Sequence, residues 1–146
     1  SQTTLQAIGR TQKNQRLFST WSHDAGRTWS KLELIDLPNC NSGTDAVTLH
    51  DGRHVLIYNH SDTDKVRYPL NVAISADGRA WDAVGVLEHE PPGQYSYPCV
   101  IQCANGDVHF AYTWKRLKMK HAFAPAARLQ SVGRIESAKW LIESDL

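Results

Sequence analysis

The chain has 146 residues, 41% of them hydrophobic, and a formal net charge of +1 with an isoelectric point near 7.8. This size and composition are typical of an ordinary folded domain, and the small net charge does not point to a nucleic-acid partner or to an anionic membrane surface. No apolar run approaches the roughly 20 residues that a membrane span requires. The opening stretch, SQTTLQAIGR, is what we expect of the interior of a longer chain, and nothing in the sequence identifies the compartment.

Short segments rich in β-branched and aromatic residues follow one another from residue 4 to about residue 124. They cover residues 5–10, 16–22, 44–50, 53–60, 69–76, 97–103 and 107–114. Turn sequences such as HDGR, ADGR and ANGD separate several of them. The pattern predicts an all-β meander over residues 1–127. The tail, 128–146, contains RIESAKWLIESDL, for which a short amphipathic helix and a poorly packed or disordered terminus are equally good interpretations.

One motif occurs twice. SHDAGRTWS begins at Ser22, and SADGRAW begins 53 residues later at Ser75, while the Asp51-Gly52 turn recurs 54 residues later at Asn105-Gly106. Two markers with nearly the same period indicate a repeat of about four strands, which is the size of a β-propeller blade.

The residue types of this motif suit a hairpin turn. Its aspartate accepts backbone N–H groups, its glycine takes a positive φ, and its tryptophan packs between sheets. One carboxylate in each turn is too few for a calcium site, so we interpret the motif as structural. The residues concerned are Ser22, Asp24, Gly26, Thr28 and Trp29 in the first copy, and Ser75, Asp77, Gly78 and Trp81 in the second.

The three cysteines show no sign of a disulfide or of a zinc site. On one strand, Cys99 and Cys103 lie about 13 Å apart, too far for a disulfide, and the spacing lacks the paired clusters that bind zinc. We therefore expect buried free thiols, no metal and no cofactor.

The repeated motif resembles the Asp-box, S-x-D-x-G-x-T-W, of the sialidase (neuraminidase) superfamily, whose members carry BNR repeats. The segment RYPLNVAISADGRAW, from Arg67, is similar to a family pattern in which an arginine opens a third strand before an Asp-box. The segment YSYPCVIQCANGDVHFAY is similar to the family's tyrosine segment. The resemblance implies a partial propeller, about two and a half four-stranded blades from the C-terminal half of a six-bladed ring.

The family's roles transfer to three positions of this sequence. Arg10 and Arg67 correspond to family arginines that hold the substrate carboxylate. Arginine suits this role because its planar guanidinium can bond to both carboxylate oxygens. The nucleophilic tyrosine corresponds to Tyr95 by its Tyr-Ser pair but to Tyr97 by the spacing to the hairpin. Since a one-residue slip turns every side chain of a strand over, we select Tyr97. The resemblance places the family's first arginine, its acid/base aspartate and its glutamate before residue 1.

Strand order also predicts that polar and aromatic residues converge on one rim of the propeller, opposite the Asp-boxes. The candidate substrate-binding residues at this rim are Asn41, Ser42, Asn59, His60, Tyr95, Trp114 and Arg116, with Lys115 beside them.

Three functions remain open at this point. The resemblance favours a sialidase-like retaining exo-glycosidase that acts on a terminal acidic sugar such as sialic acid. A lyase on uronate-containing polysaccharide and a non-catalytic propeller that binds glycans or proteins are the alternatives. The expected partners are an acidic glycan and either the remaining blades or a second copy of the chain.

Overall fold

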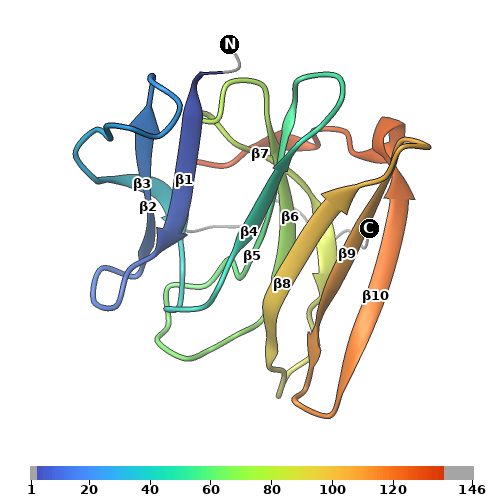
Figure 1. Cartoon of the computed structure of the whole chain (residues 1–146). Helices are drawn as coiled ribbons and strands as arrows, with labels where there is room; N and C mark the ends of the chain where they lie inside the picture. The colour runs from blue at the N-terminus through green and yellow to red at the C-terminus, as the bar shows by residue number, and fades with distance from the viewer. Residues whose placement is uncertain (1–2, 137–146) are drawn as a thin grey trace.

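A computed structural model describes residues 3–136 of the chain and shows ten strands of four or more residues (Figure 1). They are β1 (Leu5–Arg10), β2 (Arg16–Ser22), β3 (Glu33–Pro38), β4 (Asp45–Thr48), β5 (His54–Tyr58), β6 (Leu70–Ser75), β7 (Asp82–Glu88), β8 (Tyr95–Gln102), β9 (Asp107–Trp114) and β10 (Lys118–Pro125). A 3-10 turn, Ala126–Arg128, and the two-residue strand β11 (Gly133–Arg134) follow. The described part of the chain contains no α-helix, so no helix there is long and apolar enough to cross a membrane.

The strands form three antiparallel sheets, which confirms the all-β prediction. The first sheet has the order β1-β2-β3, the middle sheet β11-β7-β6-β5-β4 and the third sheet β10-β9-β8. Each of the seven segments singled out from the sequence contains a strand, whereas β3, β7 and β10 lie outside those segments.

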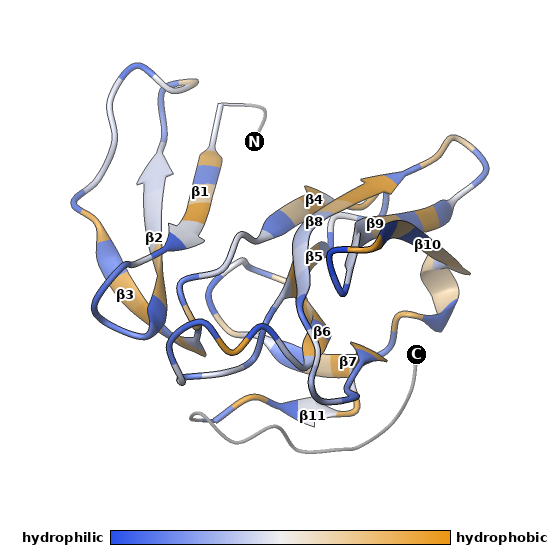
Figure 2. Cartoon of the chain, turned by 90° about the horizontal axis from the view of Figure 1, so that it is seen from below, coloured by the Kyte–Doolittle hydropathy of each residue, from blue (hydrophilic) through white to orange (hydrophobic). Residues whose placement is uncertain are grey.

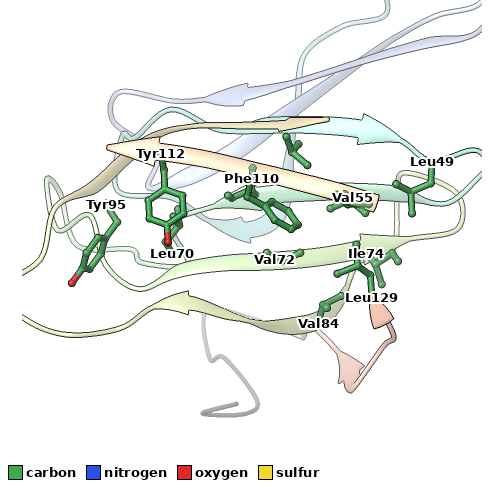
Figure 3. Packing of buried hydrophobic residues seen from close by; sticks show 13 residues of the cluster. Leu49, Val55, Leu70, Val72, Ile74, Val84, Tyr95, Phe110, Tyr112 and Leu129 are labelled. Carbon is green, nitrogen blue, oxygen red and sulfur yellow. The ribbon is translucent and has the colours of Figure 1, made fainter. Parts of the chain in front are cut away.

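The core lies between the sheets, on both faces of the middle one. Alternate residues of β5 point to opposite sides: Val55 and Ile57 pack toward the third sheet, and Leu56 and Tyr58 pack toward the first. Figure 3 shows the larger cluster, in which Val72 and Phe110 meet between the middle and third sheets. Because both faces of the middle sheet are covered, its strands β5 and β6 are buried almost throughout, unlike a half-solvated antiparallel sheet.

The outer faces of the first and third sheets carry exposed apolar side chains. On the first sheet, Leu5, Trp29 and Leu34 are 41%, 46% and 45% exposed. On the third sheet, Ile101 and Phe123 are 52% and 62% exposed, and they lie on the face opposite Phe110. Apolar patches of this kind on sheet faces mark contact surfaces.

The three cysteines are free, as expected, but only Cys40 is buried. Cys99 is exposed because it lies on the uncovered face of β8, so the expectation of burial is wrong there. The tail prediction concerns residues 128–146, of which 137–146 lie outside the described residues. Before that point, β11 pairs with β7 as a fifth strand of the middle sheet.

Candidate functional site

The strand ends divide the loops between two opposite rims of the sheets. At one rim lie the end of β1, the segments that precede β6 and β8, and the β9–β10 turn; we call this the mouth rim (lower edge in Figure 1). The turns of the two Asp-box-like motifs, residues 22–29 and 75–81, lie at the opposite rim, which we call the Asp-box rim (upper edge in Figure 1). Figure 2 looks onto the mouth rim, where the loops nearest the viewer are largely hydrophilic.

Tyr97 projects from the mouth rim because β8 is irregular at this point. The register between β8 and β9 shifts between Ser96 and Cys99, and Tyr97 has a φ of 51°, a left-handed conformation that is uncommon for a bulky side chain. The bulge turns the ring out of the sheet, so that Tyr97 is 61% exposed whereas Tyr95, two residues earlier, is fully buried. Of the two tyrosines considered for the nucleophile, only Tyr97 is accessible to a ligand.

Positive charge lies near the phenol of Tyr97. The guanidinium carbon of Arg67 lies 5.4 Å from the centre of the Tyr97 ring. A hydrogen bond from Arg67, then its positive charge and the charges of Arg10 and Arg116, lower the pKa of the Tyr97 phenol below its usual value. Arg10 is held by a hydrogen bond of 3.1 Å from its Nη1 to the carbonyl oxygen of Asn41. Gly43, two residues from Asn41, lies beside the Tyr97 ring, so the structure brings Arg10, Arg67 and Tyr97 to one part of the rim.

The remaining predicted substrate-binding residues fall into two groups. Asn41 and Trp114 are half-buried at the surface of the rim. Ser42, Asn59, His60 and Tyr95 are buried beneath it, with at most 5% of each residue exposed. The second group supports the rim from below.

Asn59 illustrates this supporting position. Its side-chain Nδ2 donates to the carbonyl oxygens of Pro69 and Tyr95, at 3.0 and 3.1 Å. Pro69 is two residues from Arg67, and Tyr95 is two residues from Tyr97. The backbone N–H of Tyr95 also donates to the carbonyl oxygen of Arg67 (3.0 Å). One buried amide therefore joins the two segments that carry the arginine and the tyrosine.

Polar atoms with unused hydrogen-bonding capacity concentrate near this rim. Seven of the residues with such buried atoms lie near this rim: Asn39, Ser42, Asn59, Arg67, Asn71, Gln94 and Ser96. The other two, Trp81 and Asp82, follow the second Asp-box turn, and Asp82 is ion-paired with Arg134. Buried polar groups are nearly always hydrogen-bonded in native proteins, so this concentration is typical of a region that meets water or a polar ligand. The buried Nη1 of Arg67 belongs to the same guanidinium that faces Tyr97.

Backbone strain concentrates in the same place. Among the described non-glycine residues with positive φ, Asn41, Lys65, Tyr97, Lys115 and Arg116 lie in loops or strand ends of the mouth rim. Left-handed conformations of such residues cost free energy and cluster at functional sites.

The Asp-box rim differs, because its polar groups bond to one another. Asp24 accepts from the backbone N–H of Thr28 (2.8 Å) and from the Thr28 hydroxyl (2.7 Å), and Ser22 donates to it (2.8 Å). Bonds to Thr28 and Ser22 lower the pKa of Asp24 to about 2. In the second copy, Asp77 accepts from the N–H groups of Arg79 and Ala80, at 2.8 and 2.9 Å. These contacts lie within each turn.

The two Asp-box tryptophans are placed differently. Trp81 is 4% exposed and packs in the cluster between the first and middle sheets. Trp29 is 46% exposed, so the expectation that it packs between two sheets of the described chain is wrong. Trp29 lies beside Leu5, on the outer face of the first sheet, where no described element covers it.

Sequence analysis missed a tyrosine–carboxylate contact. The Tyr112 hydroxyl donates to Glu88 Oε1 at 2.8 Å, and Lys120 Nζ bonds to the same oxygen. Burial, followed by the bond and charge of Glu88, raises the pKa of Tyr112. Tyr112 is 1% exposed and Glu88 is 8% exposed, so this pair is closed to a ligand. No sequence signal reports the contact, because 24 residues separate its partners.

No group of three or more metal-binding side chains occurs among residues 3–136. His109 and His121 stack on the outer face of the third sheet with ring centres 5.1 Å apart. His109 lies in the interior of β9 and His121 in the interior of β10, so neither is at the mouth rim with the arginines.

The described residues are similar in fold to part of known sialidase structures. NanB sialidase from Streptococcus pneumoniae superimposes with a TM-score of 0.66 at 15% identity, over 88% of this chain and 22% of that chain. The intramolecular trans-sialidase from Ruminococcus gnavus gives 0.67 at 17% identity, over 86% and 31% of the two chains. The leech intramolecular trans-sialidase gives 0.67 at 16% identity, over 86% and 22%. The chain therefore spans between about a fifth and a third of the length of these structures.

The antiparallel sheets and these neighbours give the chain a sialidase-like β-fold. The family model for the BNR repeat-like domain matches residues 1–110, three quarters of the sequence, and the chain belongs to this family. No curated protein matches the chain significantly.

Proposed function

We propose that the mouth rim binds the carboxylate of a terminal acidic sugar, and that the full-length protein is a sialidase-like exo-glycosidase. The observation that carries the proposal is the contact of Arg67 with the exposed ring of Tyr97, with Arg10 bonded to the neighbouring Asn41 segment. A planar guanidinium binds a carboxylate through two parallel hydrogen bonds.

Tyr97 is the proposed nucleophile. Its lowered pKa increases the fraction of phenolate, which is the form that attacks an anomeric carbon. A tyrosine nucleophile is an exception among glycosidases, found in sialidases. The structural neighbours support an anionic ligand, because one is in complex with oseltamivir carboxylate and another with a substituted ethanesulfonate.

The sheets correspond in this proposal to successive blades. The first and third sheets have three strands each, and the middle sheet has β4–β7 plus β11, which is consistent with about two and a half four-stranded blades of a six-bladed ring. The exposed apolar faces of the outer sheets would then contact the neighbouring blades, and without those blades the chain is expected to associate with itself through the same faces.

One observation favours the alternative of glycan or protein binding without catalysis, if the described residues are considered alone. No carboxylate among the described residues is hydrogen-bonded to Tyr97, while Glu88, which bonds to a tyrosine, is buried with Tyr112. Hydrolysis by this site would require an acid and a base from elsewhere in the protein.

The test is an assay of the full-length protein and its Tyr97→Phe variant on a fluorogenic sialoside. The proposal expects release of the fluorophore by the unsubstituted protein and a loss of at least about a thousandfold in the variant. Binding of the sialoside without release would support the non-catalytic alternative. An unsaturated product from a uronate-containing polysaccharide would instead identify a lyase.

A further inference from the structure

The β9–β10 turn presents positive charge in an unusual way. Lys115 and Arg116 occupy its two central positions with φ of 50° and 57°, and the Leu117 N–H donates to the Trp114 carbonyl oxygen (3.0 Å). A hairpin turn whose two central residues both take positive φ favours Asn-Gly at those positions. Here both positions hold long cationic side chains, so the turn carries charge at a conformational cost.

Two ammonium groups lie against a single aromatic ring beside this turn. Lys115 Nζ and Lys118 Nζ each lie 4.8 Å from the centre of the Trp114 ring. Lys115 has one carboxylate partner, Glu90, at 3.8 Å. Neither Lys118 nor Arg116 has a carboxylate within ion-pair distance among residues 3–136. Lys120, next along β10, differs because it is bonded to Glu88.

The turn is continuous with the cluster around Tyr97. Trp114 pairs with Tyr95 in the β8–β9 ladder, and the Lys115 N–H donates to the Gln94 carbonyl oxygen (2.9 Å). The charge of Arg116 already acts on the phenol of Tyr97. The cationic surface therefore extends from Arg10 and Arg67, past Tyr97, to the tip of the turn.

We propose that Lys115 and Lys118, which both lie against the Trp114 ring, bind a second anionic group of the ligand. The inference rests on the proposed function, in which Arg10 and Arg67 hold the first carboxylate. It specifies the ligand as a glycan with two neighbouring anionic groups. The second group is a carboxylate of an adjacent acidic sugar or a sulfate ester, since an ammonium pair recognises both as anions.

The experiment measures dissociation constants of the full-length protein for three sulfur-linked, hydrolysis-resistant sialosides. The first carries one carboxylate, the second has a second sialic acid adjacent to the first, and the third has a sulfate ester in its place. The test variant is Lys115→Gln/Lys118→Gln. The matched control is Arg27→Gln/Lys31→Gln, which removes two positive charges from the Asp-box rim.

We expect the unsubstituted protein to bind at least one dianionic probe about three- to tenfold more tightly than the monoanionic one at low salt, as two exposed charge contacts allow. The test variant should lose that advantage and keep its affinity for the monoanionic probe. The control variant should retain the advantage. The advantage should also shrink as salt is raised, because exposed charges are screened. Which dianionic probe shows the effect separates the carboxylate source from the sulfate source.

Other outcomes contradict the inference. If the unsubstituted protein binds the monoanionic probe but shows no dianionic advantage, or if the test variant keeps the advantage, the second site is wrong and the proposed function stands. If both variants lose the advantage equally, the effect is one of net charge and the site is also wrong. If no probe binds the unsubstituted protein, the proposed function fails together with the inference.

Discussion

The two rims of the same three sheets use their polar residues in opposite ways. At the Asp-box rim, Ser22, Asp24 and Thr28 bond to one another, and the carboxylates of Asp24 and Asp77 accept from backbone N–H groups of their own turns. At the mouth rim, buried polar atoms of Asn59 and Arg67 have no partner in the protein. The Asp-box turns satisfy the hydrogen bonds of their serine and aspartate side chains internally and so contribute to stability, although the buried indole N–H of Trp81 has no partner. The mouth rim has more unused donors and acceptors and can contribute to binding.

A second contrast lies within the Asp-box rim. Trp81 packs against the sheet that precedes its own, and Trp29 occupies the matching position on the first sheet, whose outer face no described element covers. The same motif therefore gives a buried ring in one sheet and a half-exposed ring in the other. The burial of the tryptophan depends on the neighbouring sheet and not on the turn.

The largest expected effect concerns these two tryptophans. In the 146-residue chain, Trp81→Ala should lower the free energy of unfolding by about 3–5 kcal/mol, and Trp29→Ala by about 1 kcal/mol because the ring is half-exposed. In the full-length protein, a preceding blade would raise the cost of Trp29→Ala toward that of Trp81→Ala. Chemical denaturation of all four proteins measures this. Equal costs for the two tryptophans in the short chain would contradict the account of their packing.

An intermediate effect is expected at Asn59, which belongs to the mouth rim but is buried. Asn59→Ala removes the two buried hydrogen bonds that this side chain donates to backbone carbonyl groups, so it should cost about 1–3 kcal/mol of stability. It should also loosen Arg67 relative to Tyr97 and raise the pKa of the Tyr97 phenol toward its usual value. The pKa is measured by NMR titration of the labelled tyrosine ring carbon.

The control for Asn59 is Ser75→Ala, a buried polar residue of the Asp-box rim. This substitution should lower stability while leaving the pKa of Tyr97 unchanged. A Tyr97 pKa that moves equally in both variants would show that general loosening, and not the contact of Asn59, is responsible.

A smaller effect is expected from pH at the Asp-box rim. The pKa of Asp24 in the folded chain is about 2, and that of Asp77 is also lowered by backbone hydrogen bonds. Since the unfolded chain binds protons more readily, these groups stabilise the fold above about pH 4, and this contribution is lost as the pH falls toward 2. The difference in denaturation midpoint between the unsubstituted protein and Asp24→Asn/Asp77→Asn should therefore shrink over that interval. A constant difference down to pH 2 would contradict the assignment.

Sequence patterns predicted the parts of the fold that depend on local residue type. Alternating β-branched and aromatic residues located seven strand segments, and the repeated SxD…G…W motif located both structural turns. β3, β7 and β10 escaped because segments such as KMKHAFAP have few β-branched residues and owe their strand structure to pairing with a neighbour.

The site was predictable in position but not in detail. Strand order placed Arg10, Arg67 and Tyr97 at one rim, and the choice of Tyr97 over Tyr95 followed from register. The burial of Asn59 and Tyr95 depends on cross-sheet contacts that a single sequence does not display. The bulge that exposes Tyr97 and the contacts of two lysines with Trp114 also depend on strand pairing that a single sequence does not display.

The central claim is that the mouth rim recognises a carboxylate through Arg67. The most direct measurement compares the binding of a sialoside and its neutral methyl ester to the full-length protein, with Arg67→Lys as the variant and Asp77→Ala as the control from the opposite rim. Arg67→Lys keeps the charge but loses the bidentate contact, so binding of the acid should weaken by ten- to a hundredfold, about 1.5–3 kcal/mol. Binding of the ester to this variant should stay unchanged. The Asp77→Ala variant should bind both the acid and the ester as the unsubstituted protein does. Equal losses for acid and ester in Arg67→Lys, or a loss of acid binding in folded Asp77→Ala, would contradict the account.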